Sequence, residues 1–234
     1  MKIITVDGPA ASGKSTVARH LAQRLGFQYV NSGALYRAFA LGLARRSIRL
    51  EDHPAVESAL SGVSIEVGPN DERTFLDGED VTAEIRTKEV SELASKVARI
   101  PAIRAQVNAK LRAIAASTSC VIDGRDIGTV VFPDADFKLY LEATLEERSR
   151  RRLLDYQRAG CDAFLEDIQA ELARRDSADA SRELAPLKLP KDAVVVNSTG
   201  QSVEQIVAKL LEQVQEAFTS EEARNPEVSV GLNC

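Results

Sequence analysis

The sequence predicts a doubly wound α/β fold, in which helices cover both faces of a parallel, five-stranded sheet. Five short apolar runs, rich in β-branched residues, alternate along the chain with segments of helical character. Polar segments that contain glycine follow three of these runs, and in such folds ligands gather beyond the carboxyl ends of the strands. We therefore expect those segments to converge on one cleft. The candidate strands are 3–7, 27–31, 119–123, 137–141 and 193–197.

The first polar segment matches the phosphate-binding pattern G-x-x-x-x-G-K-[ST] at every fixed position. Backbone N–H groups of such a loop surround a β-phosphate, and the following helix N-terminus adds partial positive charge. Lys14 would reach the β- and γ-phosphates, and the hydroxyl of Ser15 would ligate Mg²⁺. The alternative, a glycine turn with a chance lysine, is disfavoured by the complete pattern between a strand and a helix. The segment comprises Gly8, Pro9, Ala10, Ala11, Ser12, Gly13, Lys14, Ser15 and Thr16.

Length, composition and charge favour a cytoplasmic enzyme. The 234 residues allow one larger domain with an insertion or two small ones, and 44% hydrophobic residues can fill a sizeable core. A net charge of -5 argues against general affinity for nucleic acid or anionic membranes. The sequence has no apolar run near the ~20 residues of a membrane helix and no signal-peptide layout. Its three cysteines lack metal-ligand spacing, and we expect them to stay reduced.

One region departs from the alternation of strands and helices and predicts a small antiparallel insert. Two short strands of alternating pattern, 63–67 and 73–76, are separated by the turn residues 68–71. The pair Asp77-Gly78 marks a second turn.

Two helices in the C-terminal half carry a start signal. Thr144 with Glu147, and Ser202 with Gln205, have the spacing of a capping box. After the second helix, residues 219–234 are polar, contain one proline and show no helical periodicity. We expect this stretch to be a loosely ordered tail.

The other two polar segments carry arginine beside small or acidic residues. In 32–37, Arg37 would clamp the phosphate of a second substrate and Tyr36 would pack against its base or sugar; the alternative is a helix N-cap before an ordinary amphipathic helix. In 123–126, Arg125 lies between two carboxylates at a strand end and suits bidentate phosphate recognition. The alternative there is a tight polar turn.

The segment 144–182 is dense in arginine with interleaved acidic residues. A salt-bridged, solvated helix face is the default explanation for most of them. A few could close over nucleotide phosphates as a lid and neutralise transition-state charge, but charge density does not identify which. The arginines are Arg148, Arg150, Arg151, Arg152, Arg158, Arg174, Arg175 and Arg182.

In their order along the chain, these motifs resemble those of bacterial cytidylate kinases. The similarity runs from residue 1 to about 215. Within that range, further matching segments are 78–86, 123–134 and 175–187. One departure is Asn31, where members of that family often carry Asp. An amide there would weaken a contact to Mg²⁺-bound water or to an arginine.

The resemblance implies a P-loop NTPase-type doubly wound sheet with a small antiparallel insert and a helical lid. It implies one kinase unit over 1–218, with a monophosphate-binding insert at about 60–96, a lid at about 148–164, and the tail 219–234. The implied reaction transfers the γ-phosphoryl group of ATP, bound with Mg²⁺, to CMP or dCMP. The implied protein is a cytoplasmic monomer whose partners are ATP and CMP or dCMP, not nucleic acid or membrane.

Matching positions carry the family's site residues onto this chain. Lys14, Arg125 and Arg182 would be catalytic. Ser95, Arg104 and Asp126 would read the cytosine, because a carboxylate can accept from its amino group where uracil has a carbonyl. Arg37 and Arg125 would hold the acceptor phosphate, and Arg175 and Asp179 would bind the ribose. The other substrate-binding residues would be Ser32, Tyr36 and Gly124. The lid residues would be Arg148, Arg151, Arg152 and Arg158.

Two other functions are compatible with parts of the pattern. The phosphate loop would also serve a kinase for another nucleoside monophosphate, such as UMP, and a base-selectivity assay separates the two. A nucleotide-dependent switch would show slow turnover that CMP does not stimulate. Arg37, Arg125 and Arg182 suit an acceptor phosphate and speak against the switch.

Overall fold

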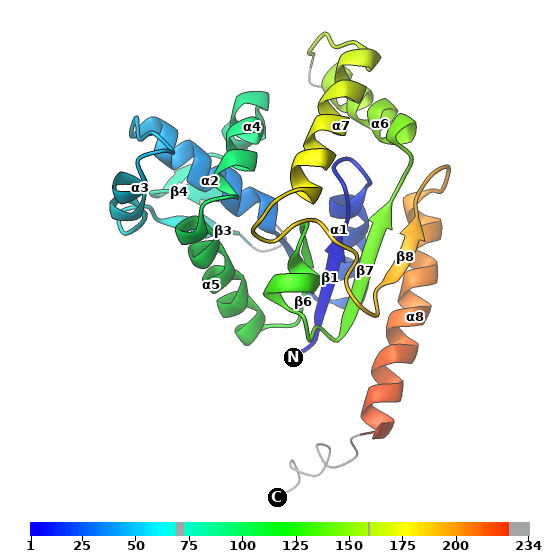
Figure 1. The fold of residues 1–234 in the computed structure, drawn as a ribbon. Helices are drawn as coiled ribbons and strands as arrows, with labels where there is room; N and C mark the ends of the chain where they lie inside the picture. Colours follow the sequence, from blue (N-terminus) through cyan, green and yellow to red (C-terminus); the bar gives the residue numbers. More distant parts are fainter. Residues whose placement is uncertain (69–72, 159, 225–234) are drawn as a thin grey trace, which may run out of the picture.

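The centre of the protein is a parallel sheet of five strands in the order β2-β6-β1-β7-β8. This confirms the predicted doubly wound α/β class, and Figure 1 shows the sheet between its helices. The structure is a computed structural model that describes residues 1–68, 73–158 and 160–224. The strands are β1 (Ile3–Asp7), β2 (Gln28–Asn31), β6 (Cys120–Asp123), β7 (Phe137–Glu142) and β8 (Val194–Asn197).

Alternation along the strands divides the core between the two faces of the sheet. In β6, Cys120 and Ile122 belong to one hydrophobic cluster and Val121 to the other. The first cluster lies under α2, α4 and α5, and the second lies under α1 and α8. Apolar runs without polar interruption fit strands that are buried on both sides. These helices are α1 (Lys14–Leu25), α2 (Ser32–Arg45), α4 (Lys88–Val97), α5 (Pro101–Ser117) and α8 (Val203–Arg224).

Polar side chains fix the starts of several helices. Both predicted capping boxes place the first residue's hydroxyl on a backbone N–H, at 3.2 Å from Thr144 to Glu147 and 3.3 Å from Ser202 to Gln205. In the second box, the side-chain oxygen of Gln205 also accepts a hydrogen bond from the N–H of Ser202 at 3.1 Å. The carboxylate of Glu147 instead accepts from Arg151 at 3.0 Å, so the first box is only half formed.

The insert contains an antiparallel sheet of three strands in the order β3-β4-β5. The two predicted strands are present, and the sequence pattern missed the third, which is two residues long and follows the turn Asp77-Gly78. Such a short exposed strand carries no alternation to detect. Of the predicted turn 68–71, residues 69–71 lie outside the described residues. The strands are β3 (Ile65–Val67), β4 (Thr74–Leu76) and β5 (Glu79–Asp80), and the helix α3 (His53–Leu60) precedes them.

Helices α6 (Leu145–Arg158) and α7 (Leu165–Ala180) form a hairpin above the carboxyl end of the parallel sheet (Figure 1). A third hydrophobic cluster joins this hairpin to the loop after β1, and its buried members are Ala10, Ile168 and Leu172. The hairpin is therefore seated on the glycine-rich loop itself. Residue 159, within the predicted lid, lies outside the described residues.

Helix α8 continues to Arg224, beyond the point where the sequence predicted a non-helical tail. The prediction is therefore wrong for residues 219–224. Glutamate, alanine and arginine are good helix formers, and the segment has no glycine or proline, so helix propensity extends the helix without an apolar stripe. The rest of the predicted tail, 225–234, lies outside the described residues. None of the helices in the described part of the chain has the length and apolarity that a membrane crossing requires.

Candidate active site

The glycine-rich loop lies between β1 and α1, in the strand–loop–helix context that the motif requires. Gly8 has φ of +145°, and a Cβ there would lie 2.0 Å from the carbonyl oxygen of Leu141. Gly13 has φ of +92° and caps α1, which begins at Lys14. Both glycines are therefore required by the backbone path, which places the loop at the N-terminus of α1, where a helix favours anions.

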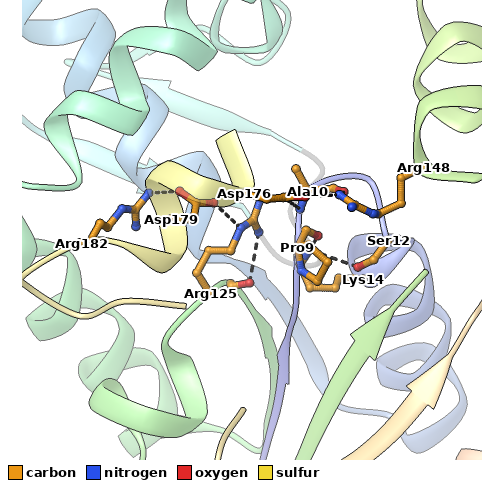
Figure 2. Close-up of polar contacts among 10 residues, drawn as sticks. Pro9, Ala10, Ser12, Lys14, Arg125, Arg148, Asp176, Asp179 and Arg182 are labelled. Atoms are coloured by element: carbon orange, nitrogen blue, oxygen red, sulfur yellow. Dashed lines mark hydrogen bonds and ion pairs between the residues drawn. The ribbon is translucent and has the colours of Figure 1, made fainter. Parts of the chain in front are cut away.

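Lys14 is almost fully buried beneath the loop. Its Nζ donates to the carbonyl oxygen of Pro9 and lies 3.4 Å from the Oγ of Ser12 (Figure 2). Burial and the nearby charge of Arg125 hold the pKa of Lys14 well below its usual range. A bound anion would stabilise the buried ammonium group.

A polar network surrounds the hydroxyl of Ser15. Ser15 donates to Asp123 Oδ2 at 2.7 Å, and the hydroxyl of Tyr29 donates to Asp123 Oδ1 at 2.9 Å. The amide of Asn31 donates to Tyr29 at 3.1 Å, while its Oδ1 caps α2 by accepting from the N–H of Ala34 at 2.9 Å. Neither Asp123 nor Asn31 belongs to the predicted site set. A hydroxyl and a carboxylate in contact supply the hard oxygen donors that suit Mg²⁺.

This chain offers only a partial ligand set for a metal. Within the described ranges there is no group of three or more histidine, cysteine or acidic side chains that could hold an ion. Mg²⁺ usually takes one or two protein ligands and completes its shell with water and substrate phosphates. Ser15 with Asp123 fits that mode.

A cavity of about 520 Å³ opens between the loop, α2, α4, the end of β6 and the α6–α7 hairpin. The three predicted polar segments converge on it, as expected from their places at strand ends. Gly8, Pro9, Ser12, Arg104 and Arg148 do not line it. The predicted site residues that do are Ala10, Ala11, Gly13, Lys14, Ser15, Thr16, Ser32, Tyr36, Arg37, Ser95, Gly124, Arg125, Asp126, Arg151, Arg152, Arg158, Arg175, Asp179 and Arg182.

Asp179 organises the arginines on one wall of this cavity. It accepts from Arg125 Nε at 2.9 Å and from a terminal nitrogen of Arg182, as Figure 2 shows. Burial alone would raise the pKa of Asp179, but Arg125, Arg182 and Arg175 together hold it below its usual value. Burial and the charge of Arg125 lower the pKa of Arg175 to about 10.

Two hydrogen-bond donors on the same wall have no acceptor in the part of the chain that the structure describes. The Nε atoms of Arg175 and Arg182 are buried and have no hydrogen-bond partner among the described residues. Arg175 lies close enough to Arg125, Arg37 and Arg152 for their charges to lower its pKa further. Several guanidinium groups held beside one carboxylate make a site for a dianion such as a phosphate.

Asp126, which lines the cavity, is held by a buried ion pair with Arg104. Arg104 donates to Asp126 Oδ2, and another nitrogen of Arg104 donates to the carbonyl oxygen of Ala98 at 3.2 Å. Burial raises the pKa of Asp126 even though Arg104 opposes the shift. The guanidinium of Arg104 also lies 5.8 Å from the ring centre of Tyr36, whose pKa burial raises to about 12. Asp126 thus has a fixed orientation at the cavity wall.

The predicted lid arginines divide into two groups. Arg148 and Arg151 bind the glycine-rich loop: Arg148 donates to Ala10 O at 3.2 Å, and Arg151 donates to Ser12 O at 3.2 Å. Arg152 stacks on Tyr156 at 4.9 Å from the ring centre, and Arg158 is exposed. Arg148 therefore joins α6 of the predicted lid to the loop and does not line the cavity.

Two more acidic residues, which are not in the predicted set, bind backbone groups next to the site. Asp7, the last residue of β1, accepts from the N–H groups of Ile127 and Gly128 at 2.9 and 2.7 Å, and burial raises its pKa to about 6. Asp176 contacts the loop at Ala10. Asp7 had a detectable signal, because it ends an apolar strand at the ligand-binding edge of the sheet, as Asp123 does.

Comparison with known proteins identifies the family of the chain. A sequence model of the family described as cytidylate kinase matches residues 4–216. The cytidylate kinase of Caldanaerobacter subterraneus subsp. tengcongensis is 43% identical over 212 residues, which cover 91% of this chain and 94% of that protein. That of Geobacillus sp. strain WCH70 is 42% identical and covers 91% and 96%, and that of Carboxydothermus hydrogenoformans is 43% identical and covers 89% and 95%. With a match of this length and identity to proteins of one kind, the chain belongs to the cytidylate kinase family.

Proposed function

We propose that this protein transfers the γ-phosphoryl group of ATP to CMP or dCMP, giving ADP and CDP or dCDP. One observation carries the proposal: two phosphate-type sites and a buried carboxylate face a single cavity. Lys14 lies at the first, Arg125 and Arg182 lie at the second, and Asp126 lies at the inner wall. Binding of both substrates in this cavity would hold the donor and acceptor phosphates close together for the transfer.

The donor would bind on the loop 8–16, with Lys14 at the β- and γ-phosphates. The burial of Lys14 near Arg125 supports this role, because a bound anion would stabilise the charged ammonium group and oppose the lowering of its pKa. Ser15 and Asp123 would hold Mg²⁺. The metal, when bound, would neutralise charge on the ATP phosphates.

The acceptor would bind with its phosphate among Arg37, Arg125 and Arg182 and its ribose near Arg175 and Asp179. The leftover Nε donors of Arg175 and Arg182 support that placement. The base would reach the inner wall, where Tyr36 offers its ring.

Cytosine recognition would rest on Asp126, with Ser95 and Arg104. A carboxylate is only an acceptor when ionised, so it favours the amino group of cytosine over the carbonyl of uracil. Arg104 fixes that carboxylate from behind and keeps it from rotating away.

The transfer itself needs no covalent enzyme intermediate. A phosphate oxygen of CMP would attack the γ-phosphorus in line, and that oxygen is already anionic near neutral pH. Strong general-base catalysis is therefore unnecessary, and Lys14, Arg125 and Arg182 would act by positioning and by neutralising developing charge.

The organisation of the chain supports the same activity. We propose that the insert at about 60–96 forms the acceptor-side wall, since Ser95 of α4 lines the cavity. The α6–α7 hairpin would act as the lid that excludes water during transfer. We also propose that the protein works as a cytoplasmic monomer, for which its net charge of -5 and ordinary composition are suitable.

The experiment that tests the function compares acceptors in competition. ADP formation from MgATP is measured with CMP, dCMP, UMP, AMP and GMP, and we expect strong preference for CMP and dCMP. Equal activity with UMP or a purine would overturn the cytosine assignment and leave a nucleotide kinase. Turnover that no acceptor stimulates would favour a nucleotide-dependent switch.

A further inference from the structure

Both backbone groups of Ala10 in the glycine-rich loop are held by the α6–α7 hairpin. The N–H of Ala10 donates to Asp176 Oδ1 at 3.4 Å, and its carbonyl oxygen accepts from Arg148 Nη1 at 3.2 Å. The same Nη1 donates to Asp176 Oδ2 at 2.6 Å, which closes a ring through one residue of the loop, Ala10 (Figure 2). Arg148 comes from α6 and Asp176 from α7.

The Arg148–Asp176 pair is shielded from water. Only 8% of the Arg148 side chain and 23% of the Asp176 side chain are exposed. Arg148 is further oriented by a bond from its Nε to the carbonyl oxygen of Ala143 at 3.0 Å. A charge pair with this little exposure is weakly screened and has a defined geometry, unlike an ordinary surface ion pair.

Apolar contacts also connect the loop at Ala10 to the α6–α7 hairpin. Ala10 forms the third hydrophobic cluster with Ile168 and Leu172 of α7, and no strand residue belongs to that cluster. Ala11, which packs against it, has a φ of +58°. The hairpin is thus supported by the loop that would receive the ATP phosphates.

Helix α7 also carries residues of the proposed acceptor site on either side of Asp176. Asp176 follows Arg175 and precedes Asp179 by one helical turn, and both of these line the cavity. A shift of α7 would therefore move the acceptor wall and the peptide of Ala10 together.

We propose that Arg148 and Asp176 are a positioning pair that couples the two substrate sites, by tying the conformation of the loop at Ala10 to the seating of α7. Binding of ATP would favour the seated hairpin, and the seated hairpin would favour CMP, with equal effect in both directions. This inference rests on the proposed function, since it assumes that the loop binds ATP and the arginine wall binds CMP.

Asp176→Asn tests the pair with little change in side-chain volume. Dissociation constants for a non-hydrolysable ATP analogue are measured by calorimetry with and without CMP, and those for CMP with and without the analogue. In the wild type we expect each ligand to tighten the other by about tenfold, within the usual range of such couplings. In Asp176→Asn we expect that factor to fall to about one, and binding of the analogue alone to weaken by about tenfold.

Two further variants separate positioning from general stability. Arg148→Lys keeps the positive charge but loses the fork that reaches two carbonyls and a carboxylate, so we expect a smaller loss of coupling in a folded protein. The matched control is Glu146→Gln, which removes a 2.6 Å ion pair to Arg150 on the exposed side of the same helix. It should leave all four dissociation constants within about twofold of the wild type.

The outcomes are distinguishable. Coupling that survives in both Asp176→Asn and Arg148→Lys would overturn the inference, as would equal weakening of both ligands without loss of coupling. If the wild type binds neither nucleotide or shows no CMP-dependent ADP formation, the proposed function itself fails. Should Asp176→Asn not fold, Arg148→Lys alone decides the matter.

Discussion

Arg104 and Asp126 form a hydrogen-bonded ion pair in which both side chains are buried, with 4% and 6% of their surfaces exposed. Arg104 also donates to the carbonyl oxygen of Ala98, the C-cap residue of α4. The carboxylate is thus fixed before any ligand arrives, and an oxygen held at the cavity wall can discriminate between bases at little cost in ordering.

Replacing Asp126 by Asn should change both stability and base preference. Removing one partner leaves the charge of Arg104 buried, which costs about 3–5 kcal/mol in the free energy of unfolding. The amide can donate to the carbonyl of uracil, so kcat/KM for CMP relative to UMP should fall by roughly tenfold to a hundredfold.

Denaturant unfolding and competitive assays with both acceptors measure these two effects. Glu79→Gln is the control, because Glu79 pairs with Arg45 at 2.7 Å on the surface and its replacement should leave the free energy of unfolding and the base preference close to those of the wild type. An Asp126→Asn enzyme that keeps the wild-type selectivity would refute the base-reading role.

Lys14→Met should make the protein more stable and much less active. The charged lysine is disfavoured by burial in the folded state, so its pKa there lies below that of the unfolded chain. The unfolded state therefore binds the proton more tightly at neutral pH, and removing the group removes that penalty. Loss of a positive charge aimed at the transferring phosphoryl group should lower kcat/KM by about 10² to 10³.

Thermal unfolding and ADP release test this pair of effects. Lys209→Met, on the exposed surface of α8, should alter neither quantity. A lower melting temperature for Lys14→Met would contradict the prediction.

Asp7 should make stability fall as the pH rises through about 6. Burial raises its folded-state pKa from 3.8 to about 6, so between these values the folded state holds a proton that the unfolded state has released. Stability due to that proton is present at low pH and is lost above the folded pKa. From pH 5 to pH 7.5 the loss amounts to about 1.4 kcal/mol.

The measurement is the difference in free energy of unfolding between wild type and Asp7→Asn across this pH range. Asn cannot titrate, so other ionisable groups cancel in the difference. Acidic and basic groups near Asp7 are Asp126 and Lys14, and Tyr140 responds to its charge. A difference that does not vary with pH would contradict the assignment.

Asn31→Asp should lower the Mg²⁺ concentration that the enzyme needs. The new carboxylate would keep the cap of α2 through one oxygen while adding a second negative group beside Ser15 and Asp123. Mg²⁺ prefers such oxygen ligands, and we expect half-saturation at several-fold lower metal.

Titration of activity with Mg²⁺ at fixed ATP gives the answer. Asn31→Ala serves as the comparison, since it loses the cap at a cost of about 1 kcal/mol but adds no ligand. If the alanine variant shifts the metal requirement as much as the aspartate variant, the amide has a role other than the one assigned here.

The sheet and the phosphate loop could be predicted because their signals are local. Each strand lies in a short, mostly apolar run, and Gly8 and Gly13 are required by the backbone path of the loop. The cleft could also be predicted, because ligands of such folds bind beyond the carboxyl ends of strands such as β1 and β6. Asp7 and Asp123 occupy those ends, so attention to the last residue of each apolar run would have added both to the candidate site.

The roles of the lid arginines could not be predicted in the same way. Arg148 and Arg150 are two residues apart on α6, yet one is buried against Ala10 and the other is 62% exposed. Helical periodicity places them on different faces, but only the tertiary structure shows which face meets the loop. The end of α8 escaped prediction for another reason, because it continues on propensity without an apolar face.

Strand β6 has one more consequence, for the way the molecule melts. Val121 packs with the layer on one side of the sheet, and Cys120 and Ile122 pack with the layer on the other. Neither layer can lose its order without exposing side chains of a strand that the other layer needs. We therefore expect the part that would bind ATP and the part that would bind the pyrimidine to unfold together. Scanning calorimetry should then show a single cooperative peak.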